Sequence, residues 1–265
     1  MTEPVNQTIL LLDIEKFGTR DDVEQAFMRR MLYSVLHETL RGTGVEPAEQ
    51  RLEDRGDSVM ALINPTYPKA KLLHALITET PSFLHANNRL AAPSARVRLR
   101  MVLASGEVAV QELGGALGGA VGWDLNQAFR LLNSDVLRTA LAHRDEPCVL
   151  SVSDAVYQGI VRHGHRGLPP EAFHPITVAG KEGEFTAWLH GAPAPTRPAP
   201  AQIAPADDGS GHPRTEDRSC APTAFQFLGG APSFGGSLIA GDQHIVSGGQ
   251  VNGDIHTGNT FGGGR

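Results

Sequence analysis

Apolar residues recur with strand and helix periods through the first 190 residues, and their order predicts a mixed fold. Residues 9–12 are all apolar, which is typical of a buried strand. Between residues 27 and 40 apolar residues recur at three- and four-residue spacings, which predicts a helix that ends at Gly42 or Gly44. Residues 47–63 fit two strands joined by a tight turn.

The central part of the chain continues this pattern. Residues 68–88 favour a helix, and we expect an interruption at Pro81 because proline lacks a backbone N–H. Residues 96–104 alternate arginines with apolar residues, which predicts a strand with one apolar face. A second strand is expected at 108–113, before a glycine-rich segment and a helix that contains Asn126.

The last patterned segments are a strand at 148–152, a helix at 154–163 and two closing strands around Ile176 and Phe185. The core elements follow the order β-α-β-β-α-β. We therefore predict an α+β fold with a ferredoxin-like core and additions. Such a core does not by itself define a chemistry.

Composition changes sharply near Gly191 and divides the chain into three parts. We expect one globular domain in residues 1–190. A proline-rich stretch begins there, and residues 191–224 are predicted to be a disordered linker. Residues 225–265 form a glycine-rich tail.

Charge and cysteine content narrow the class of protein. The net charge of −6 over 265 residues argues against sequence-independent binding to nucleic acid. Cys148 and Cys220 lie far apart without metal-ligand spacing, as in a reduced cytosolic chain. The sequence contains neither an apolar run of the ~20 residues that a membrane span needs nor a recognisable signal peptide. We therefore expect a cytoplasmic protein without a membrane partner.

Two aspartates and one polar helix face are the candidates for chemistry. Asp13 ends the first apolar run, and Asp57 opens another, so both are expected at strand ends. Mg²⁺ is usually held by one or two carboxylates together with substrate phosphates. Asn126 and Arg130 lie one helical turn apart and therefore share a face. Each feature alone has a structural reading, as a cap, a turn residue or a surface pair.

Taken together, these residues resemble the catalytic domain of class III nucleotidyl cyclases, the adenylyl and guanylyl cyclases. The matching positions are Asp13-Ile14-Glu15-Lys16-Phe17, Gly56-Asp57, and Gly122, Asn126, Ala128 and Arg130 in the last motif. The resemblance implies that Asp13 and Asp57 bind two Mg²⁺ or Mn²⁺ ions. It also implies that Asn126 positions the ribose and that Arg130 stabilises the pentavalent phosphate. The reaction would convert a nucleoside triphosphate to a 3′,5′-cyclic nucleotide and pyrophosphate.

The same resemblance suggests three substrate-binding residues. Arg100 matches an arginine that contacts the triphosphate, although its strand has Val102 and Ala104 where the family has glycine and histidine. A solvated strand face is the alternative for Arg100. Lys181 resembles a phosphate-binding lysine in a late turn, and it is equally explained as a solvated turn residue.

Glu53 occupies the position that selects the purine, where glutamate implies guanine. A carboxylate can accept the N–H donors of guanine, which adenine lacks. In the family, a second base-selecting residue lies three positions before the glycine that corresponds to Gly122. This chain has Gly119 there, and glycine is the residue of neither adenylyl nor guanylyl cyclases at that position. Cyclases of bacterial antiphage systems that make cyclic pyrimidine nucleotides also depart from the purine pattern. GTP is favoured, and UTP and CTP remain open.

Class III sites form between two subunits, so the resemblance implies a homodimer with two equivalent sites. The segment between Ser105 and Gly122 looks short and glycine-rich for the family, and part of it normally helps dimerisation.

The tail contains an internal repeat. Gly241-Asp-Gln-His244 recurs as Gly253-Asp-Ile-His256, and residues 235–261 have little charge and no proline, which suits in-register stacking. This resembles RHIM-like bacterial amyloid signalling motifs, which implies a sensor protein with a matching motif as partner. A flexible tail without a role is the alternative.

Two functions follow from these observations. The first is an active nucleotidyl cyclase in bacterial signalling, with a possible antiphage role. The second is a cyclase-like nucleotide-binding module without turnover, assembled through its tail. A diguanylate cyclase relative is disfavoured because the chain has no Gly-Gly-Asp/Glu-Glu-Phe hairpin.

Overall fold

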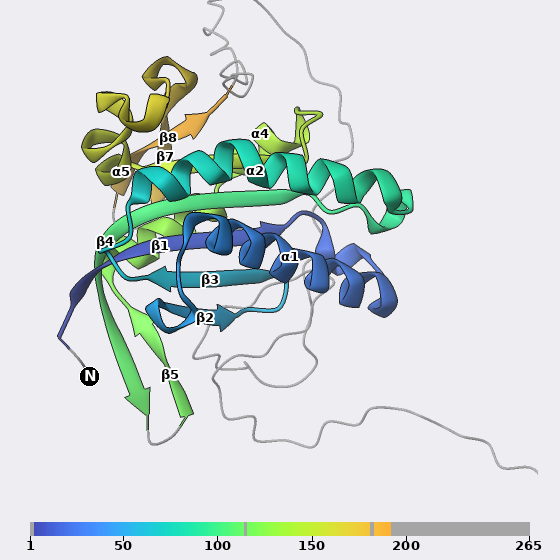
Figure 1. The fold of residues 1–265 in the computed structure, drawn as a ribbon, viewed down its shortest axis with the longest axis horizontal. Coiled ribbons are helices and arrows are strands. Elements are labelled where there is room, and N and C mark those ends of the chain that lie inside the picture. The colour runs from blue at the N-terminus through green and yellow to red at the C-terminus, as the bar shows by residue number, and fades with distance from the viewer. Residues whose placement is uncertain (1–2, 114–115, 181–182, 192–265) are drawn as a thin grey trace, which may run out of the picture. The chain divides into compact units, whose positions relative to one another are not determined.

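The computed structural model describes residues 3–113, 116–180 and 183–191 (Figure 1). The strands are β1 (Val5–Ile14), β2 (Gln50–Asp54), β3 (Ser58–Ile63), β4 (Leu99–Leu113), β5 (Ala116–Val121), β6 (Cys148–Ser153), β7 (Phe173–Gly180) and β8 (Gly183–His190). The helices are α1 (Asp22–Thr43), α2 (Lys69–Leu90), α3 (Trp123–Leu132), α4 (Asp135–Ala142) and α5 (Asp154–Gly159). Lys181 and the predicted linker and tail from residue 192 onward lie outside the described residues.

The strands form one sheet in the order β2-β3-β1-β4-β6-β8-β7, and β5 pairs with β4. The first four strands of this order are antiparallel neighbours, and α1 and α2 connect them in the sequence β1-α1-β2-β3-α2-β4. This is the ferredoxin-like arrangement, so the predicted α+β fold is confirmed. β6 then joins β4 in parallel, and β8 and β7 extend the sheet.

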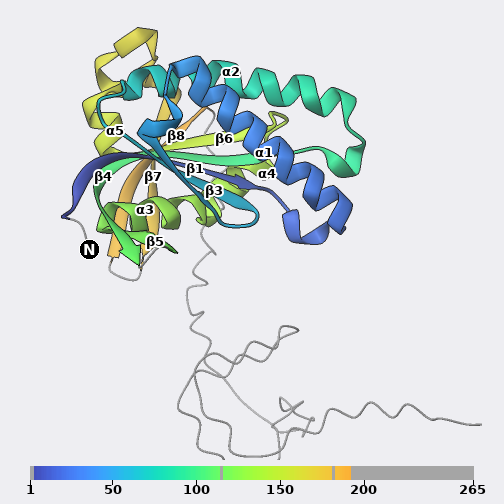
Figure 2. The same ribbon diagram turned by 60° about the horizontal axis from the view of Figure 1, so that its bottom comes forward.

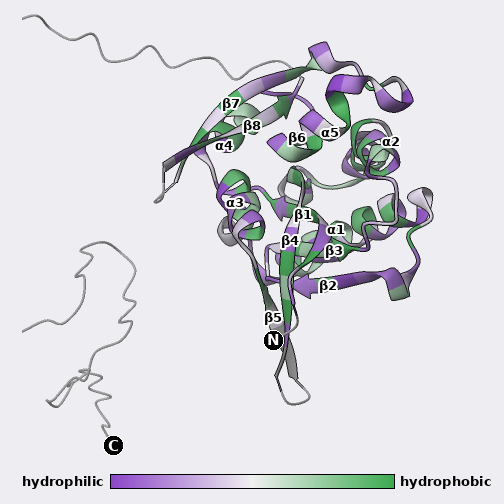
Figure 3. Ribbon diagram, turned by 90° about the vertical axis from the view of Figure 1, so that its left-hand side faces the viewer, coloured by the Kyte–Doolittle hydropathy of each residue, from purple (hydrophilic) through white to green (hydrophobic). Residues whose placement is uncertain are grey.

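The sheet separates two hydrophobic layers, because alternate side chains of a strand point to opposite faces. In β1, Leu10, Leu12 and Ile14 pack with α1 and α2, whereas Ile9 and Leu11 pack with α3 and α4. Figure 3 shows these helix pairs on opposite sides of the sheet, and Figure 2 shows α3 across the sheet from α1 and α2. Asp13 belongs to the second set by its position in the strand and faces the α3 and α4 side.

Helix α2 continues through Pro81, so the predicted interruption is wrong. Buried residues lie on both sides of the proline, including Leu76 before it and Leu84 after it. The Thr80 hydroxyl also lies 2.9 Å from the Thr39 hydroxyl of α1. Tertiary contacts on one helix face therefore offset the hydrogen bond that proline removes.

The two predicted strands at 96–104 and 108–113 are one long strand, β4, and the glycine-rich segment after it includes the unpredicted strand β5. The continuity of β4 has a physical cause in its neighbour, because β1 pairs with it from Leu99 to Val108. Helix α4 was also not predicted, and the helix expected at 154–163 ends at Gly159, followed by a 3-10 turn.

None of the helices in residues 3–113, 116–180 and 183–191 combines the length and apolar character that a membrane span needs.

Candidate active site

Asp13, Asp57 and Arg100 meet at one end of the sheet. Asp13 lies opposite Ser58 of β3 and opposite Arg100 of β4. The backbone N–H of Ile14 donates to the Asp57 carbonyl at 3.0 Å, which fixes the β2–β3 turn beside the end of β1. Asp57 itself is exposed. The predicted pair of aspartates is thus brought together by strand pairing.

Asp13 is a buried carboxylate with a charged partner. Its side chain is 7% exposed, and it accepts a hydrogen bond at 3.0 Å from the Arg100 Nε. Burial raises the pKa of the Asp13 carboxyl above its usual value. The Arg100 guanidinium opposes this pKa shift, and the nearby charge of Asp57 adds to it. A second cation near the two carboxylates would offset both the burial of the Asp13 charge and its repulsion by the Asp57 charge.

The residues present fit a divalent cation of the Mg²⁺ type. Two carboxylates approach one another at the end of β1, and one of them is exposed and free of a side-chain partner among the described contacts. Such a pair supplies the oxygen ligands that Mg²⁺ uses when phosphates complete its shell. Within the described residues, no group of three or more His, Cys, Asp and Glu side chains forms a metal cage.

Glu53 lies on the edge strand β2 and pairs with Arg51 of the same strand and with Arg55 of the turn that follows it. Arg55 Nη2 lies 3.3 Å from Glu53 Oε2, and Arg51 Nε lies 3.5 Å from Oε1. The Glu53 side chain is 17% exposed. A nucleobase that donated hydrogen bonds to the Glu53 carboxylate would share its oxygens with the guanidinium groups of Arg51 and Arg55.

Helix α3 presents Asn126 and Arg130 as predicted, with its apolar face buried. Leu125 and Leu132 are buried, Phe129 packs partly against the same cluster, and Asn126 is exposed. The helix starts close to β4, where the Asp124 side chain accepts a hydrogen bond at 3.0 Å from the Glu107 N–H.

Gly122 explains why the motif begins with glycine. A Cβ on Gly122 would lie 2.4 Å from the Glu107 carbonyl oxygen and 3.4 Å from the Val108 Cα. Only a residue without a side chain allows the start of α3 to lie this close to β4.

Replacing Gly122 with alanine is expected to destabilise the fold by about 1–3 kcal/mol, because the new methyl group must push α3 away from β4. Urea unfolding measures this change. Gly119→Ala is the matched control, since a Cβ at Gly119 meets nothing within 4 Å. Equal stability of the two variants would contradict the close contact at Gly122.

Arg130 lies against the end of the β7 strand. A Cβ on Gly180 would lie 3.3 Å from the Arg130 Nη1, so the guanidinium passes directly over this glycine. Gly180 precedes Lys181 in the chain. The predicted catalytic arginine and the strand leading to the predicted phosphate-binding lysine are therefore neighbours.

An aromatic contact joins Glu53 to the α3 helix. The Arg55 guanidinium, which pairs with Glu53, lies 4.4 Å from the centre of the Phe129 ring. The predicted residues thus form two groups on the same face of the sheet. The carboxylate group contains Asp13, Asp57 and Arg100, and the helix group contains Glu53, Asn126 and Arg130.

Gly119 lies in β5, and a Cβ at this position would meet nothing within 4 Å. The position that reads the base edge in the resembled family contributes no side-chain hydrogen-bonding group here, because it is a glycine. This geometry does not select a purine.

Arg98 has a structural role that sequence reasoning missed. It donates to the carbonyl oxygens of Leu141 at 2.6 Å and Arg144 at 2.7 Å, at the end of α4. It also lies 3.7 Å from Glu15. The alternation of arginines in residues 96–100 gave no signal for this, because α4 was not predicted. The solvated strand face proposed as the alternative for Arg100 is wrong, since Arg98 caps a helix and Arg100 pairs with Asp13.

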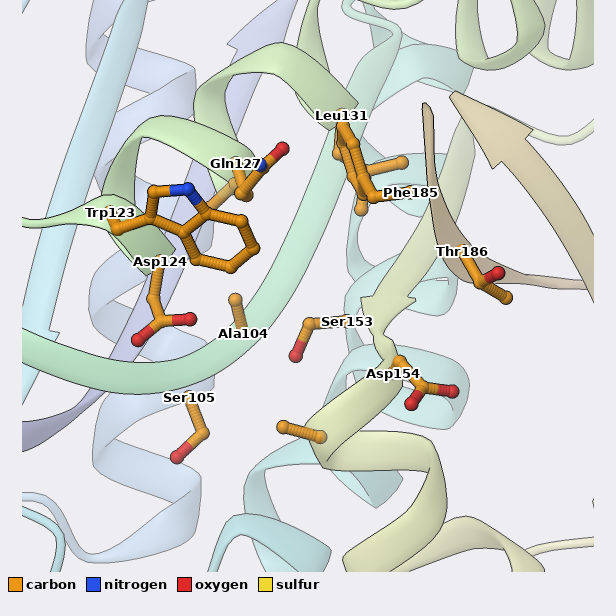
Figure 4. Close-up of a pocket in the computed structure, with 12 residues that line it drawn as sticks. Ala104, Ser105, Trp123, Asp124, Gln127, Leu131, Ser153, Asp154, Phe185 and Thr186 are labelled. Carbon is orange, nitrogen blue, oxygen red and sulfur yellow. The ribbon is translucent and has the colours of Figure 1, made fainter. Parts of the chain in front are cut away.

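A cavity of about 400 Å³ lies on another side of α3, between this helix, β4, β8 and the start of α5. Figure 4 shows Trp123, Asp124 and Gln127 of α3 facing Ser153 and Asp154 across it. Its polar lining offers two carboxylates, and the described residues around it include no basic side chain. It is therefore unsuited to a triphosphate, and we place the candidate site at the two residue groups instead.

The sequence matches no protein-family model and no curated protein sequence. Solved structures give a clear result. The guanylyl cyclase Cya2 superposes with a TM-score of 0.52 at 16% identity, covering 74% of this chain and 98% of that one. The guanylate cyclase domain of RhGC from Catenaria anguillulae, in complex with GTP, gives 0.50 at 18% identity, covering 73% and 100%. A bacterial light-regulated adenylyl cyclase gives 0.50 at 15% identity, covering 71% and 91%. The described domain therefore has the fold of guanylyl and adenylyl cyclase catalytic domains.

Proposed function

We propose that the protein is a nucleotidyl cyclase, which converts a nucleoside triphosphate to a 3′,5′-cyclic nucleotide and pyrophosphate. The observation that carries this proposal is the meeting of Asp13, Asp57 and Arg100 at one end of a cyclase-type sheet. The helix group on the same face supports it, because Asn126 and Arg130 provide the amide and the guanidinium that such a reaction needs.

In this reaction the ribose 3′-hydroxyl gives its proton to water while its oxygen attacks the α-phosphorus in line. The bond from the α-phosphorus to the bridging oxygen of pyrophosphate breaks, and pyrophosphate leaves. Asp13 and Asp57 would hold two Mg²⁺ or Mn²⁺ ions, which would draw charge from the triphosphate and the attacking oxygen. Asn126 orients the ribose. Arg130 would stabilise the transferred phosphate by its charge, and such fixed charges dominate phosphoryl transfer.

Arg100 has two successive partners in this scheme. It neutralises Asp13 in the protein without metal. If a bound cation took over that role, the Arg100 guanidinium would be free to bind the triphosphate. Lys181, which follows Gly180 in the sequence, would provide a second phosphate contact. Metal and nucleotide should therefore bind cooperatively.

GTP is the favoured substrate because Glu53 can accept the donors of guanine. The two arginines beside Glu53 and the open space at Gly119 weaken this preference. UTP and CTP therefore stay within the proposal.

A homodimer would complete the sites. The carboxylate group and the helix group of one chain would each meet the complementary group of the partner, which gives two equivalent sites under twofold symmetry. The tail at 225–265, joined by the linker at 191–224, would assemble with an amyloid-motif sensor and raise the local concentration of domains. Activation by assembly of the tail would suit bacterial antiphage signalling.

The alternative is a binding module without turnover. The contacts of Glu53 with Arg51 and Arg55, and the missing side chain at Gly119, favour it over a purine-specific enzyme. This module would bind nucleotide without releasing pyrophosphate.

The two functions are separated by incubating the purified protein with each of the four nucleoside triphosphates and Mn²⁺ at several protein concentrations. Pyrophosphate release is measured together with the mass of the product, and EDTA provides the control. We expect one cyclic nucleotide, whose rate of formation rises faster than linearly with protein concentration. Nucleotide binding without any cyclic product would support the binding module.

Manganese affinity should depend on pH through Asp13. A proton competes with the metal for this carboxylate, and burial raises the pKa of Asp13. As the pH falls, Mn²⁺ binding should therefore begin to weaken at a higher pH than it would if Asp13 had the ordinary aspartate pKa of about 4. Titration calorimetry of Mn²⁺ between pH 7 and pH 4 measures this. An affinity that stays constant down to about pH 4 would contradict the pKa shift.

A further inference from the structure

A cluster of basic side chains surrounds a second cavity, and no residue of the carboxylate group or the helix group lines it. The cavity has a volume of about 350 Å³ and lies between the end of α2, the start of β4 and the loop from α4 to β6. Its positively charged lining consists of Arg89, Arg96, Arg98 and Arg144, and His85 and Asp145 also line it. This concentration of positive charge contrasts with the net charge of −6 for the whole chain.

The walls of this arginine cavity are held in place by hydrogen bonds to the backbone. The Asn88 side chain of α2 donates to the Val97 carbonyl at 2.7 Å and accepts from the Val97 N–H at 2.8 Å. The Leu99 N–H donates to the Pro147 carbonyl at 2.9 Å. The three segments that carry the arginines are thus fixed relative to one another without any ligand.

Of the four arginines that line the cavity, Arg98 and Arg144 already have partners. Arg98 is committed to the carbonyl oxygens at the end of α4 and to Glu15, so it acts as a fixed wall. Arg89 and Arg96 are exposed, and neither pairs with a carboxylate among the described residues. Their charges are available to a ligand in the cavity.

The chemistry of the lining selects the ligand. Guanidinium groups gathered around one space repel each other, and a multiply charged anion removes this cost. Planar guanidinium forks match phosphate oxygens in pairs. A cavity of this size suits a small molecule and not an extended nucleic-acid strand.

We propose that the arginine cavity binds a small phosphate-bearing anion, with Arg89 and Arg96 as its contacts and Arg98 as the positioning residue. The site neighbours the carboxylate group, because Arg98 pairs with Glu15, two residues after Asp13. It does not depend on the proposed cyclase activity.

The test is titration calorimetry of the full chain with tripolyphosphate in EDTA, so that no divalent cation occupies the carboxylates. The double variant Arg89→Gln/Arg96→Gln should weaken binding by at least about tenfold, because two charge-assisted contacts are lost. The matched control Arg30→Gln/Arg41→Gln removes the same charge from exposed positions of α1 and should change the affinity by less than about twofold. Melting temperatures check that each variant is folded.

Arg100→Gln separates this site from the proposed triphosphate site. Binding that persists in Arg100→Gln and is lost in Arg89→Gln/Arg96→Gln supports the arginine cavity, whatever the outcome for turnover. Three results would overturn the arginine cavity as a binding site. They are loss of binding in Arg100→Gln but not in Arg89→Gln/Arg96→Gln, an equal loss in Arg30→Gln/Arg41→Gln, and no binding of tripolyphosphate to the wild-type chain. Inorganic phosphate and a nucleoside monophosphate are titrated in parallel, and tighter binding of the latter would identify the ligand as a nucleotide.

Discussion

Replacing Asp57 with alanine is expected to lower the rate of cyclic nucleotide formation by at least about a thousandfold. This corresponds to about 4 kcal/mol of lost transition-state stabilisation, a plausible size for the loss of a metal ligand. Asp57 is exposed, and its contact with Ile14 uses the backbone carbonyl, which alanine retains. The variant should therefore keep its fold while losing activity.

The measurement is the rate of product formation with saturating Mn²⁺ and the preferred nucleotide. Glu171→Ala is the control, because Glu171 is exposed and lies in a short turn between α5 and β7. It should retain full activity. Turnover by Asp57→Ala within about tenfold of the wild type would remove Asp57 from the metal site, even if the protein proved to be a cyclase.

Mixing two inactive variants is expected to restore activity. Asp57→Ala damages the carboxylate group, and Asn126→Ala/Arg130→Ala damages the helix group. If each site combines the two groups from different chains, a mixed dimer contains one fully intact site and one doubly damaged site. Random pairing makes about half of the dimers mixed, so about a quarter of the wild-type activity should return.

A matched mixture controls for this result. Asp57→Ala mixed with Asp13→Asn places both changes in the carboxylate group, so every site in the mixed dimer stays damaged and no activity should return. Rescue in the first mixture alone would establish sites shared between chains. Failure of rescue, with mixed dimers demonstrated by mass, would show that each site lies within one chain.

Local patterns were sufficient for most of the fold. The apolar run at 9–12 lies in β1, and the apolar spacings at 27–40 lie in α1, which ends before Gly44. The tight turn between β2 and β3 has Gly56 at a φ of 85°, a conformation that glycine adopts without strain. These features depend on residues close in sequence, so a single chain is enough to predict them.

The tertiary structure alone decided which distant residues are partners. Asp13 pairs with Arg100 because the register of β1 against β4 places them opposite one another. Arg98, two residues earlier on the same face, instead caps α4, a helix whose short pattern predicted nothing. The passage of α2 through Pro81 has the same origin, since contacts with α1 outweigh a local rule.

The candidate site shows both sources of information. The sequence by itself determined which side chains are present and that Asn126 and Arg130 share a helix face, because helical spacing is a local property. Only the tertiary structure decided that Asp13 is buried beside a guanidinium, that Arg55 stacks on Phe129, and that three segments enclose the arginine cavity. Burial and charge pairing depend on strands and helices far apart in the chain, and no local pattern encodes them.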